Sequence, residues 1–337
     1  MSYWSAIRLL ILNVHDPIEA AKREYESRLP DIIRKKYYVL VSGKGSLDNG
    51  SSCVVKKVKR NGSSDGTMYV AKIMEVDIFN DYNIPKYQNE INALKALNHK
   101  NIINLVENYN DDRNLVIILP YLYMSLKRYI TEFLDNDSYI KLDHWKTLAN
   151  QICSAIKYIH EKNIVHRDIK PENIMFKDFR FNEVKQDNWD KEKTKGYSVG
   201  TSYYMAPEFA KVMKNFILRI REGAAAEGYE YDGSIDIWSF GIVNYYVLSK
   251  KYPWNCSNRM REDEKKNEDI DLYNEIIEGA LDFSLFRSIR KDDDIEVMID
   301  FIHKLCQAEK DKRINSVQAL QHIIFQEKKH KIHLEKS

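Results

Sequence analysis

The part of this 337-residue chain best suited to catalysis is the run His166-Arg167-Asp168-Ile169-Lys170-Pro171-Glu172-Asn173. A carboxylate such as that of Asp168 can orient an attacking hydroxyl and accept its proton, and a cation such as Lys170 can stabilise a transferring phosphoryl group. The amide oxygen of Asn173 can bind magnesium. Because phosphoryl transfer needs these three groups close together, the run predicts a catalytic loop rather than a polar surface turn.

At these residues the sequence resembles the eukaryotic protein kinase family, and the lysine two positions after Asp168 is typical of the serine/threonine branch. The resemblance extends over about residues 38–322. It implies that Lys72, in Val70-Ala71-Lys72, contacts the α- and β-phosphates of ATP, and that Glu90 on the next helix holds it by an ion pair. It also implies that the γ-phosphate is transferred to serine or threonine hydroxyls of protein substrates.

Further motifs similar to those of the family follow later in the chain. Gly200-Thr201 and Met205-Ala206-Pro207-Glu208 resemble the segment that seats the substrate hydroxyl and ends the activation loop. Asp236-Ile237-Trp238-Ser239-Phe240-Gly241 resembles the buried helix whose aspartate braces the catalytic loop. The resemblance further implies that Arg313 pairs with Glu208, a structural pair whose loss would lower stability before it lowers activity.

The resemblance also implies an adenine site. The hinge would be Pro120-Tyr121-Leu122, and Leu119 would guard the back of the pocket. A stripe of valine, alanine and methionine is more often plain core, so this assignment rests on the family positions. The residues implied to bind ATP are Gly50, Val55, Ala71, Lys72, Glu90, Leu119, Tyr121, Leu122, Met175 and Asp187.

The phosphate-covering loop departs from the family's GxGxxGxV, in which glycines let backbone N–H groups approach the phosphates. Counting back from Lys72 aligns Gly50 with the second glycine and Val55 with the valine. Cys53 then stands at the third glycine. An alternative alignment uses Gly43-Lys44-Gly45, with a longer loop.

The metal-binding Asp-Phe-Gly motif is also altered. Asp178-Phe179 lies too close to Asn173, so Asp187-Asn188-Trp189 is the predicted counterpart. Asp187 keeps the carboxylate that would hold Mg²⁺ together with Asn173, and Asp190 is a fallback ligand. Asn188 and Trp189 replace phenylalanine and glycine, and an amide in that apolar slot costs about 1–3 kcal/mol if it finds no partner. These replacements support an alternative function, a pseudokinase that binds nucleotide or acts as a scaffold.

Arg167, beside the catalytic aspartate, resembles the arrangement in kinases that are switched on by phosphorylation of the activation loop. An upstream kinase or autophosphorylation would modify Thr194, Tyr197 or Ser198. Glu172 lies where family members that favour basic substrates carry a carboxylate, although the second such position is Tyr246.

Strand-like segments with glycine-rich turns precede mainly helical periodicity, with the join near residues 120–125. The expected fold is α+β and bilobal. It comprises a helical extension (residues 1–36), a small β-rich lobe (37–121), a larger helical lobe (122–325) and a basic tail (326–337). Helices are expected at 18–28, 85–98, 145–159, 235–248 and 295–305, and strands at 37–41, 52–55, 68–74, 102–108 and 115–119.

Composition argues against several other classes. Lys plus Arg number 52 against 50 for Asp plus Glu, which gives no electrostatic case for a nucleic-acid partner. The four cysteines show no CxxC pairing, and no GxxxxGK[ST] occurs, so a zinc knuckle and a P-loop are not expected. The N-terminal apolar run is too short to span a membrane, and it lacks the small-residue cleavage site of a signal peptide. We therefore expect a cytoplasmic or nuclear protein.

Overall fold

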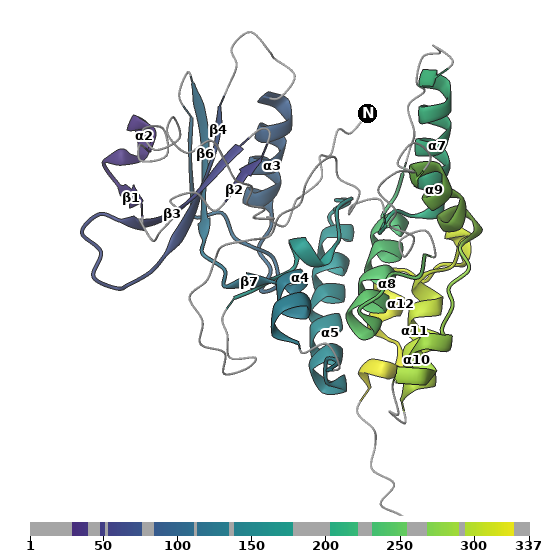
Figure 1. Ribbon diagram of the computed structural model, residues 1–337. Helices are drawn as coiled ribbons and strands as arrows, with labels where there is room; N and C mark the ends of the chain where they lie inside the picture. The colour runs from purple at the N-terminus through teal and green to yellow at the C-terminus, as the bar shows by residue number, and fades with distance from the viewer. Residues whose placement is uncertain are drawn as a thin grey trace, which may run out of the picture. The chain divides into compact units, whose positions relative to one another are not determined.

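The computed structural model describes residues 29–39, 48–50, 53–75, 84–110, 113–134, 138–177, 203–221, 231–254, 268–289 and 294–326, which are the coloured parts of Figure 1. They form two compact units. The first contains the described residues up to 138 together with those between 158 and 204, and the second contains 139–157 and the described residues from 205 onward. The predicted helix at 18–28 and the basic tail beyond 326 lie outside the described residues. The predicted lobe boundary at 121 and 122 stays a prediction.

An antiparallel sheet is the core of the first unit, and its central strands are rich in valine, isoleucine and leucine. The strand order is β1-β3-β4-β6-β5, and β2 also pairs with β3. The strands are β1 (Tyr37–Val39), β2 (Asp48–Gly50), β3 (Cys53–Arg60), β4 (Tyr69–Glu75), β5 (Glu107–Asn110) and β6 (Asn114–Pro120).

The two faces of this sheet form separate apolar clusters, because successive residues of a strand point to opposite sides. Helix α3 (Ile84–Ala96) covers one face and the short helix α2 (Asp31–Arg34) covers the other (Figure 1). The α3 cluster consists of Met74, Ile91, Leu94, Leu115, Ile117 and Leu119. The α2 cluster consists of Leu29, Ile33, Tyr37, Val58, Ala71, Ile73, Val116 and Ile118. Burial of each large side chain contributes about 1.5–3 kcal/mol, so both helices are fixed to the sheet.

A separate two-stranded antiparallel sheet links the segment after β6 to the segment after the catalytic run. Strand β7 (Met124–Ser125) pairs with β8 (Met175–Phe176), although these strands are far apart in sequence. After β7 the chain forms α4 (Leu126–Arg128), whose first turn is capped by the Ser125 hydroxyl, and then a π-helical turn (Tyr129–Phe133). The β7–β8 pairing therefore returns the chain to the hinge immediately after residues 166–173.

Helix α8 (Ser234–Ser249) is the core of the second unit. Its residues from Phe240 onward are all buried, as expected of a helix that is apolar on every side. It contacts α10 and α11, and Asn244 accepts a hydrogen bond of 2.8 Å from Nε1 of Trp145 on α5. The other helices are α5 (Leu142–His160), α7 (Pro207–Arg221), α9 (Glu268–Glu278), α10 (Ser284–Ile289), α11 (Ile295–Leu305) and α12 (Ser316–Leu320).

Helices α8 and α11 approach each other closely at Gly241. A Cβ atom at this position would clash with the Sγ atom of Cys306 and lie 3.0 Å from Cβ of Leu305. The thiols of Cys306 and Cys153 are both buried and donate to backbone carbonyls. Burial raises the pKa of Cys153 to about 12 and also raises the pKa of Cys306. Both thiols are therefore protonated and inert in the folded unit.

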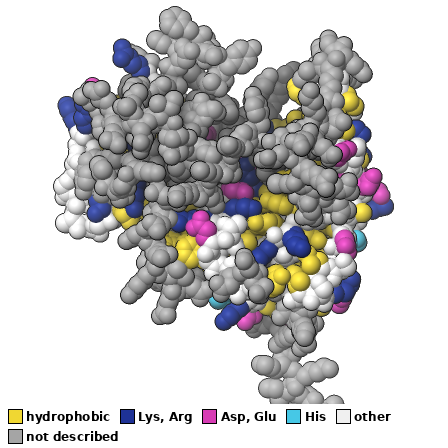
Figure 2. All heavy atoms as spheres, in the orientation of Figure 1, with side chains coloured by type: hydrophobic (Ala, Val, Ile, Leu, Met, Phe, Trp, Pro, Cys, Tyr) yellow, Lys and Arg dark blue, Asp and Glu magenta, His cyan; other side chains and the backbone are white. Residues whose placement is uncertain are grey.

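On the face drawn in Figure 2, the described acidic and basic side chains are interspersed, in keeping with the formal net charge of +2. Among the described helices, none combines the length and the apolar composition that a membrane crossing requires.

Candidate active site

Lys72 and Glu90 form a buried ion pair inside the first unit. Lys72 lies on the face of β4 that α3 covers, and Glu90 precedes the buried Ile91 on that helix. The Lys72 Nζ atom lies 2.8 Å from Oε1 and 3.0 Å from Oε2 of Glu90. Each side chain is only 10% exposed. The pair predicted from the sequence is thus confirmed, with the ammonium held against both carboxylate oxygens.

The catalytic run folds as a tight loop whose backbone is fixed from within. Arg167 has a left-handed φ of 68°, which turns the chain before Asp168. The buried ring of His166 accepts a hydrogen bond of 3.2 Å at Nδ1 from the Asp168 N–H. Beyond this turn, the Asn173 N–H donates to the Lys170 carbonyl at 2.9 Å. These bonds fix the turn that carries the functional side chains.

The three side chains singled out from the sequence lie together in this loop. The Nζ atom of Lys170 forms an ion pair with Oδ1 of Asp168 at 3.0 Å, and each side chain is 11% exposed. Asn173 is fully buried and donates from Nδ2 to the Asp168 carbonyl at 2.6 Å. Among the described residues, Oδ1 of Asn173 has no hydrogen-bond partner. A buried amide oxygen without a donor is suited to bind a cation such as Mg²⁺.

The residues implied to line the adenine site are on β3 and β6, on the segment after β6, and on β8. Leu119 is buried near the end of β6, and Val55 is buried on β3. Tyr121 and Leu122 are half-buried, and the Tyr121 N–H donates to the Met68 carbonyl at 3.2 Å. Met175, half-buried, lies on β8 opposite Ser125. The contacts of these five residues with adenine stay predictions.

The assignment of Ala71 to the adenine site is wrong. Ala71 is fully buried in the α2 cluster, on the face of β4 opposite Lys72. Side chains alternate along a strand, so the residue that shares the face of Lys72 is Val70, two positions earlier. In the register of β3 and β4, Val55 is opposite Lys72, and Lys57 is opposite Val70. Counting in steps of two from Lys72 would have found Val70 from the sequence.

The glycine-poor loop is flanked by β2 and β3, which pair with each other. Gly50 pairs with Cys53, and Asp48 pairs with Val55. This register agrees with the alignment that gives Gly50 and Cys53 the second and third glycine positions. The alternative, Gly43-Lys44-Gly45, lies outside the described residues.

The protein kinase domain model matches residues 42–325, which include every part of this site. The chain belongs to the protein kinase domain family. It is 31% identical over 224 residues to calcium-dependent protein kinase 5 of Plasmodium berghei (strain Anka), covering 64% of this chain and 34% of that protein. The protein of the same name from Plasmodium falciparum (isolate 3D7) is 32% identical over 243 residues, covering 68% and 36%. The chain thus spans about a third of the length of these curated relatives.

Two solved structures share the kinase fold at low sequence identity. The autoinhibited serine kinase domain of the giant muscle protein titin aligns with a TM-score of 0.61 at 20% identity, covering 88% of this chain and 82% of that chain. The crystal structure of Rad53 1-466 in complex with AMP-PNP aligns with a TM-score of 0.60 at 20% identity, covering 90% and 68%. The sheet and helices of the chain, α+β and bilobal as expected, are those of a protein kinase.

Several kinase-domain residues named from the sequence lie outside the described residues. They include the predicted metal ligand Asp187 with Asn188 and Trp189, the fallback ligand Asp190, and the candidate phosphorylation sites Thr194, Tyr197 and Ser198. Half of the predicted Mg²⁺ site, Asn173, therefore fits a metal by its chemistry and burial, and the other half stays a prediction.

Asp236 is fully buried in the first turn of α8.

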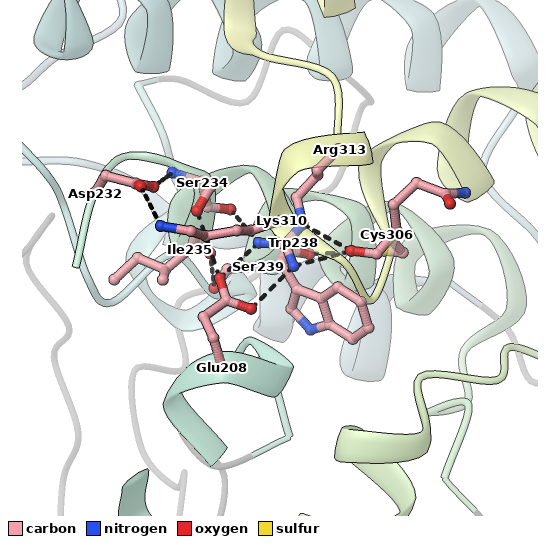
Figure 3. Close-up of polar contacts among 10 residues, drawn as sticks. Glu208, Asp232, Ser234, Ile235, Trp238, Ser239, Cys306, Lys310 and Arg313 are labelled. Carbon is pink, nitrogen blue, oxygen red and sulfur yellow. Dashed lines mark hydrogen bonds and ion pairs between the residues drawn. The ribbon is translucent and has the colours of Figure 1, made fainter. Parts of the chain in front are cut away.

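The kinase domain's predicted structural ion pair is confirmed in the second unit (Figure 3). Arg313 donates from Nη1 to Oε1 of Glu208 at 2.8 Å and from Nη2 to Oε2 at 3.0 Å. It also donates to the carbonyls of Ser234 and Gln307. Its guanidinium lies 5.2 Å from the ring centroid of Trp238. The pair joins the start of α7 to the start of α8 and to the segment after α11.

Proposed function

We propose that this chain is an ATP-dependent protein serine/threonine kinase. The observation that carries the proposal is the loop in which Asp168, Lys170 and Asn173 contact one another. The loop is followed directly by β8, which pairs with β7 just after the hinge. The preformed Lys72–Glu90 pair supports the proposal, because this pair has the place and the charge needed to hold nucleotide phosphates.

In the proposed reaction, Asp168 accepts the proton of a serine or threonine hydroxyl as the oxygen bonds to the γ-phosphorus of ATP. The bond from that phosphorus to the β–γ bridging oxygen breaks, and ADP leaves. Lys170 stabilises the charge on the transferring group, and Lys72 holds the α- and β-phosphates. Mg²⁺, when bound, would neutralise charge on the β- and γ-phosphates, and Asn173 with Asp187 would hold it.

The direct test is incorporation of labelled phosphate from ATP into the protein and a mixed serine/threonine peptide pool, with Mg²⁺. We expect labelling that Asp168→Asn abolishes and that Asp271→Asn leaves unchanged, since Asp271 is an exposed carboxylate on α9. Labelling that survives Asp168→Asn would contradict the proposed role of this residue.

The alternative is a nucleotide-binding pseudokinase. Two features favour it, the Asn188-Trp189 replacement and the single aligned glycine of the phosphate loop. ATP binding without any labelling, with Mg²⁺ or Mn²⁺ and after treatment with an activating kinase, would support this alternative and exclude the active enzyme.

The proposed substrate preference is for basic residues near the acceptor hydroxyl. In the described structure, Oε2 of Glu172 is buried and has no hydrogen-bond partner, so a cationic substrate side chain would satisfy it. On a peptide array, we expect enrichment of arginine and lysine that Glu172→Gln reduces. An array without such enrichment would remove the preference and leave the kinase activity unaffected.

A further inference from the structure

The chain ahead of the family match is part of the first unit's core. The match begins at residue 42, yet residues 29–37, here called the leading segment, insert three large side chains into the sheet. Leu29 is 4% exposed, Ile33 is 0% and Tyr37 is 1%. This burial is as complete as that of the kinase core itself, so the leading segment is more than a surface extension.

The leading segment packs directly behind the strand that carries Lys72. Its three apolar side chains share a cluster with Ala71 and Ile73, the two neighbours of Lys72 on β4. Since Lys72 points to the opposite face, β4 is held between α3 on one side and the leading segment on the other. The position of Lys72 thus depends on contacts made at both faces of its strand.

Polar contacts fasten the end of the leading segment to the sheet. Glu107 of β5 lies 2.6 Å from Nη2 of Arg60 and 3.7 Å from Nζ of Lys36, and it accepts a hydrogen bond from the Tyr109 hydroxyl. Arg60 also donates from Nε to the Tyr37 hydroxyl at 3.3 Å. Burial alone would raise the pKa of Glu107, but these hydrogen bonds and cations lower it, so the carboxylate stays charged.

Backbone bonds fasten the same region. The Asn61 N–H donates to the Lys36 carbonyl at 2.8 Å, and its side-chain amide donates to the carbonyls of Lys35 at 2.9 Å and Arg34 at 3.2 Å. Strand β1 then pairs with β3, with Tyr37 opposite Arg60. The leading segment is therefore bound to β3 by backbone and apolar contacts, and to β5 by the ion pair between Lys36 and Glu107.

We propose that the leading segment is a positioning element of the nucleotide site, which holds β4 from behind and so sets where Lys72 meets the phosphates of a nucleoside triphosphate. This inference rests on the proposed function, in which Lys72 binds those phosphates. The physical reason is that a vacated core position relaxes partly, and the relaxation moves the backbone of the strand that lines it. A charge-assisted bond to phosphate weakens when its donor moves.

The test is the dissociation constant of ATP with Mg²⁺, measured by calorimetry on the full chain at a temperature where every variant is folded. We expect Ile33→Ala to raise the dissociation constant about three- to tenfold and Ile33→Val to leave it near the wild-type value. The stability-matched control is Met298→Ala, because Met298 is 0% exposed on α11 in the second unit. It should lower the unfolding temperature without changing the dissociation constant.

A second pair of variants separates packing from the polar contacts. Tyr37→Ala should weaken ATP binding, whereas Tyr37→Phe, which keeps the ring and loses the hydroxyl, should not. The proposal is overturned if Ile33→Ala and Tyr37→Ala bind ATP as tightly as Met298→Ala does, since the leading segment would then act on stability alone. If the intact chain itself binds no ATP, the proposed function fails together with this inference, and the wild-type measurement shows that before any variant is made.

Discussion

Two buried ion pairs, one in each unit, use the same charges in different ways. Arg313 in the second unit has five N–H donors, and all five are used, two on Glu208, one on the Ser234 carbonyl and two on the Gln307 carbonyl. Lys72 in the first unit has three donors, and within the described residues its hydrogen bonds go to the two oxygens of Glu90 alone.

This difference separates a structural pair from one built to receive a ligand. A guanidinium whose five donors are all used cannot donate to a substrate. A buried ammonium with one unused donor costs about 1–3 kcal/mol until it donates to an acceptor. A phosphate oxygen is such an acceptor. The comparison therefore predicts that loss of the Arg313 pair harms folding and that loss of the Lys72 pair harms chemistry.

The largest effect is expected for Arg313→Met. It would leave the Glu208 carboxylate and two carbonyls without their donor, and breaking a buried pair in this way costs about 3–5 kcal/mol. Thermal unfolding should show the loss, and the ATP affinity of the folded protein should not change. The control is Arg287→Met, which breaks an ion pair with Glu296 that is exposed on both sides. An equal fall in unfolding temperature for both variants would contradict the structural role of Arg313.

Lys72→Met should lower phosphate transfer at least about 100-fold, which corresponds to about 2.7 kcal/mol of transition-state stabilisation. The methionine fills a similar volume but leaves the buried Glu90 without its partner, so the unfolding temperature should also fall. What separates the two variants is that only Lys72→Met should slow phosphate transfer per folded molecule. Steady-state rates with a peptide substrate measure the effect. Lys95→Met, at an exposed position of α3, is the control. Wild-type rates in Lys72→Met would remove the distinction between the two pairs.

Glu90→Gln is expected to lower kcat/KM for ATP roughly tenfold, about 1.4 kcal/mol. The amide oxygen still accepts one hydrogen bond from Lys72, but the attraction between opposite charges is lost and the lysine is held less firmly. The same kinetic assay with varied ATP concentration measures it. If the unfolding temperature fell and kcat/KM did not change, the Lys72–Glu90 pair would be structural, like the Arg313–Glu208 pair.

The smallest effect concerns Asp232, which accepts hydrogen bonds from the Ser234 N–H at 2.8 Å and from Lys310 at 3.1 Å beside the Arg313 pair (Figure 3). Burial would raise the pKa of Asp232, but the hydrogen bonds from Ser234 and Lys310 lower it below 3.8. A lowered pKa adds stability above pH 3.8 that is lost as the pH falls through the folded-state value. The exposed pair contributes less than about 1 kcal/mol because solvent screens it.

Unfolding of wild type and Asp232→Asn should therefore differ slightly at neutral pH and converge below pH 3.8. A difference that stays constant with pH would show that the carboxylate charge contributes nothing there.

Residues in motifs of fixed spacing were the most predictable from sequence. The Lys72–Glu90 and Arg313–Glu208 pairs were predicted because each partner stands at a position that the family resemblance identifies. The bounds of α11 were predicted correctly, since its apolar residues follow an unbroken helical period.

Predictions that depended on which side of an element faces the site were weaker. Ala71 was assigned to the wrong face because the alternation of side chains along β4 was not applied. Ala71 is one residue from Lys72, so its side chain lies on the opposite face of the strand. The strand expected at 102–108 is β5 (Glu107–Asn110), which begins later, because the apolar residues 102–106 pack as a loop against both clusters. The strand at Tyr37 was predicted, but the burial of Leu29 and Ile33 in the core was not, because these side chains share a face with Tyr37 only when the sheet has formed.

The close approach of α8 and α11 at Gly241 shields the thiol of Cys306, so the reactivity of this thiol can be used to measure unfolding of the second unit. Cys306 and Cys153 lie in this unit, and both thiols are shielded and protonated in the folded state. A thiol-specific reagent added to the native protein should modify Cys306 only when α8 and α11 separate, and Cys153 only when its contact with Ser316 of α12 is lost. The rate of their modification, measured by peptide mass spectrometry, would then give the rate at which the second unit opens, without an engineered probe.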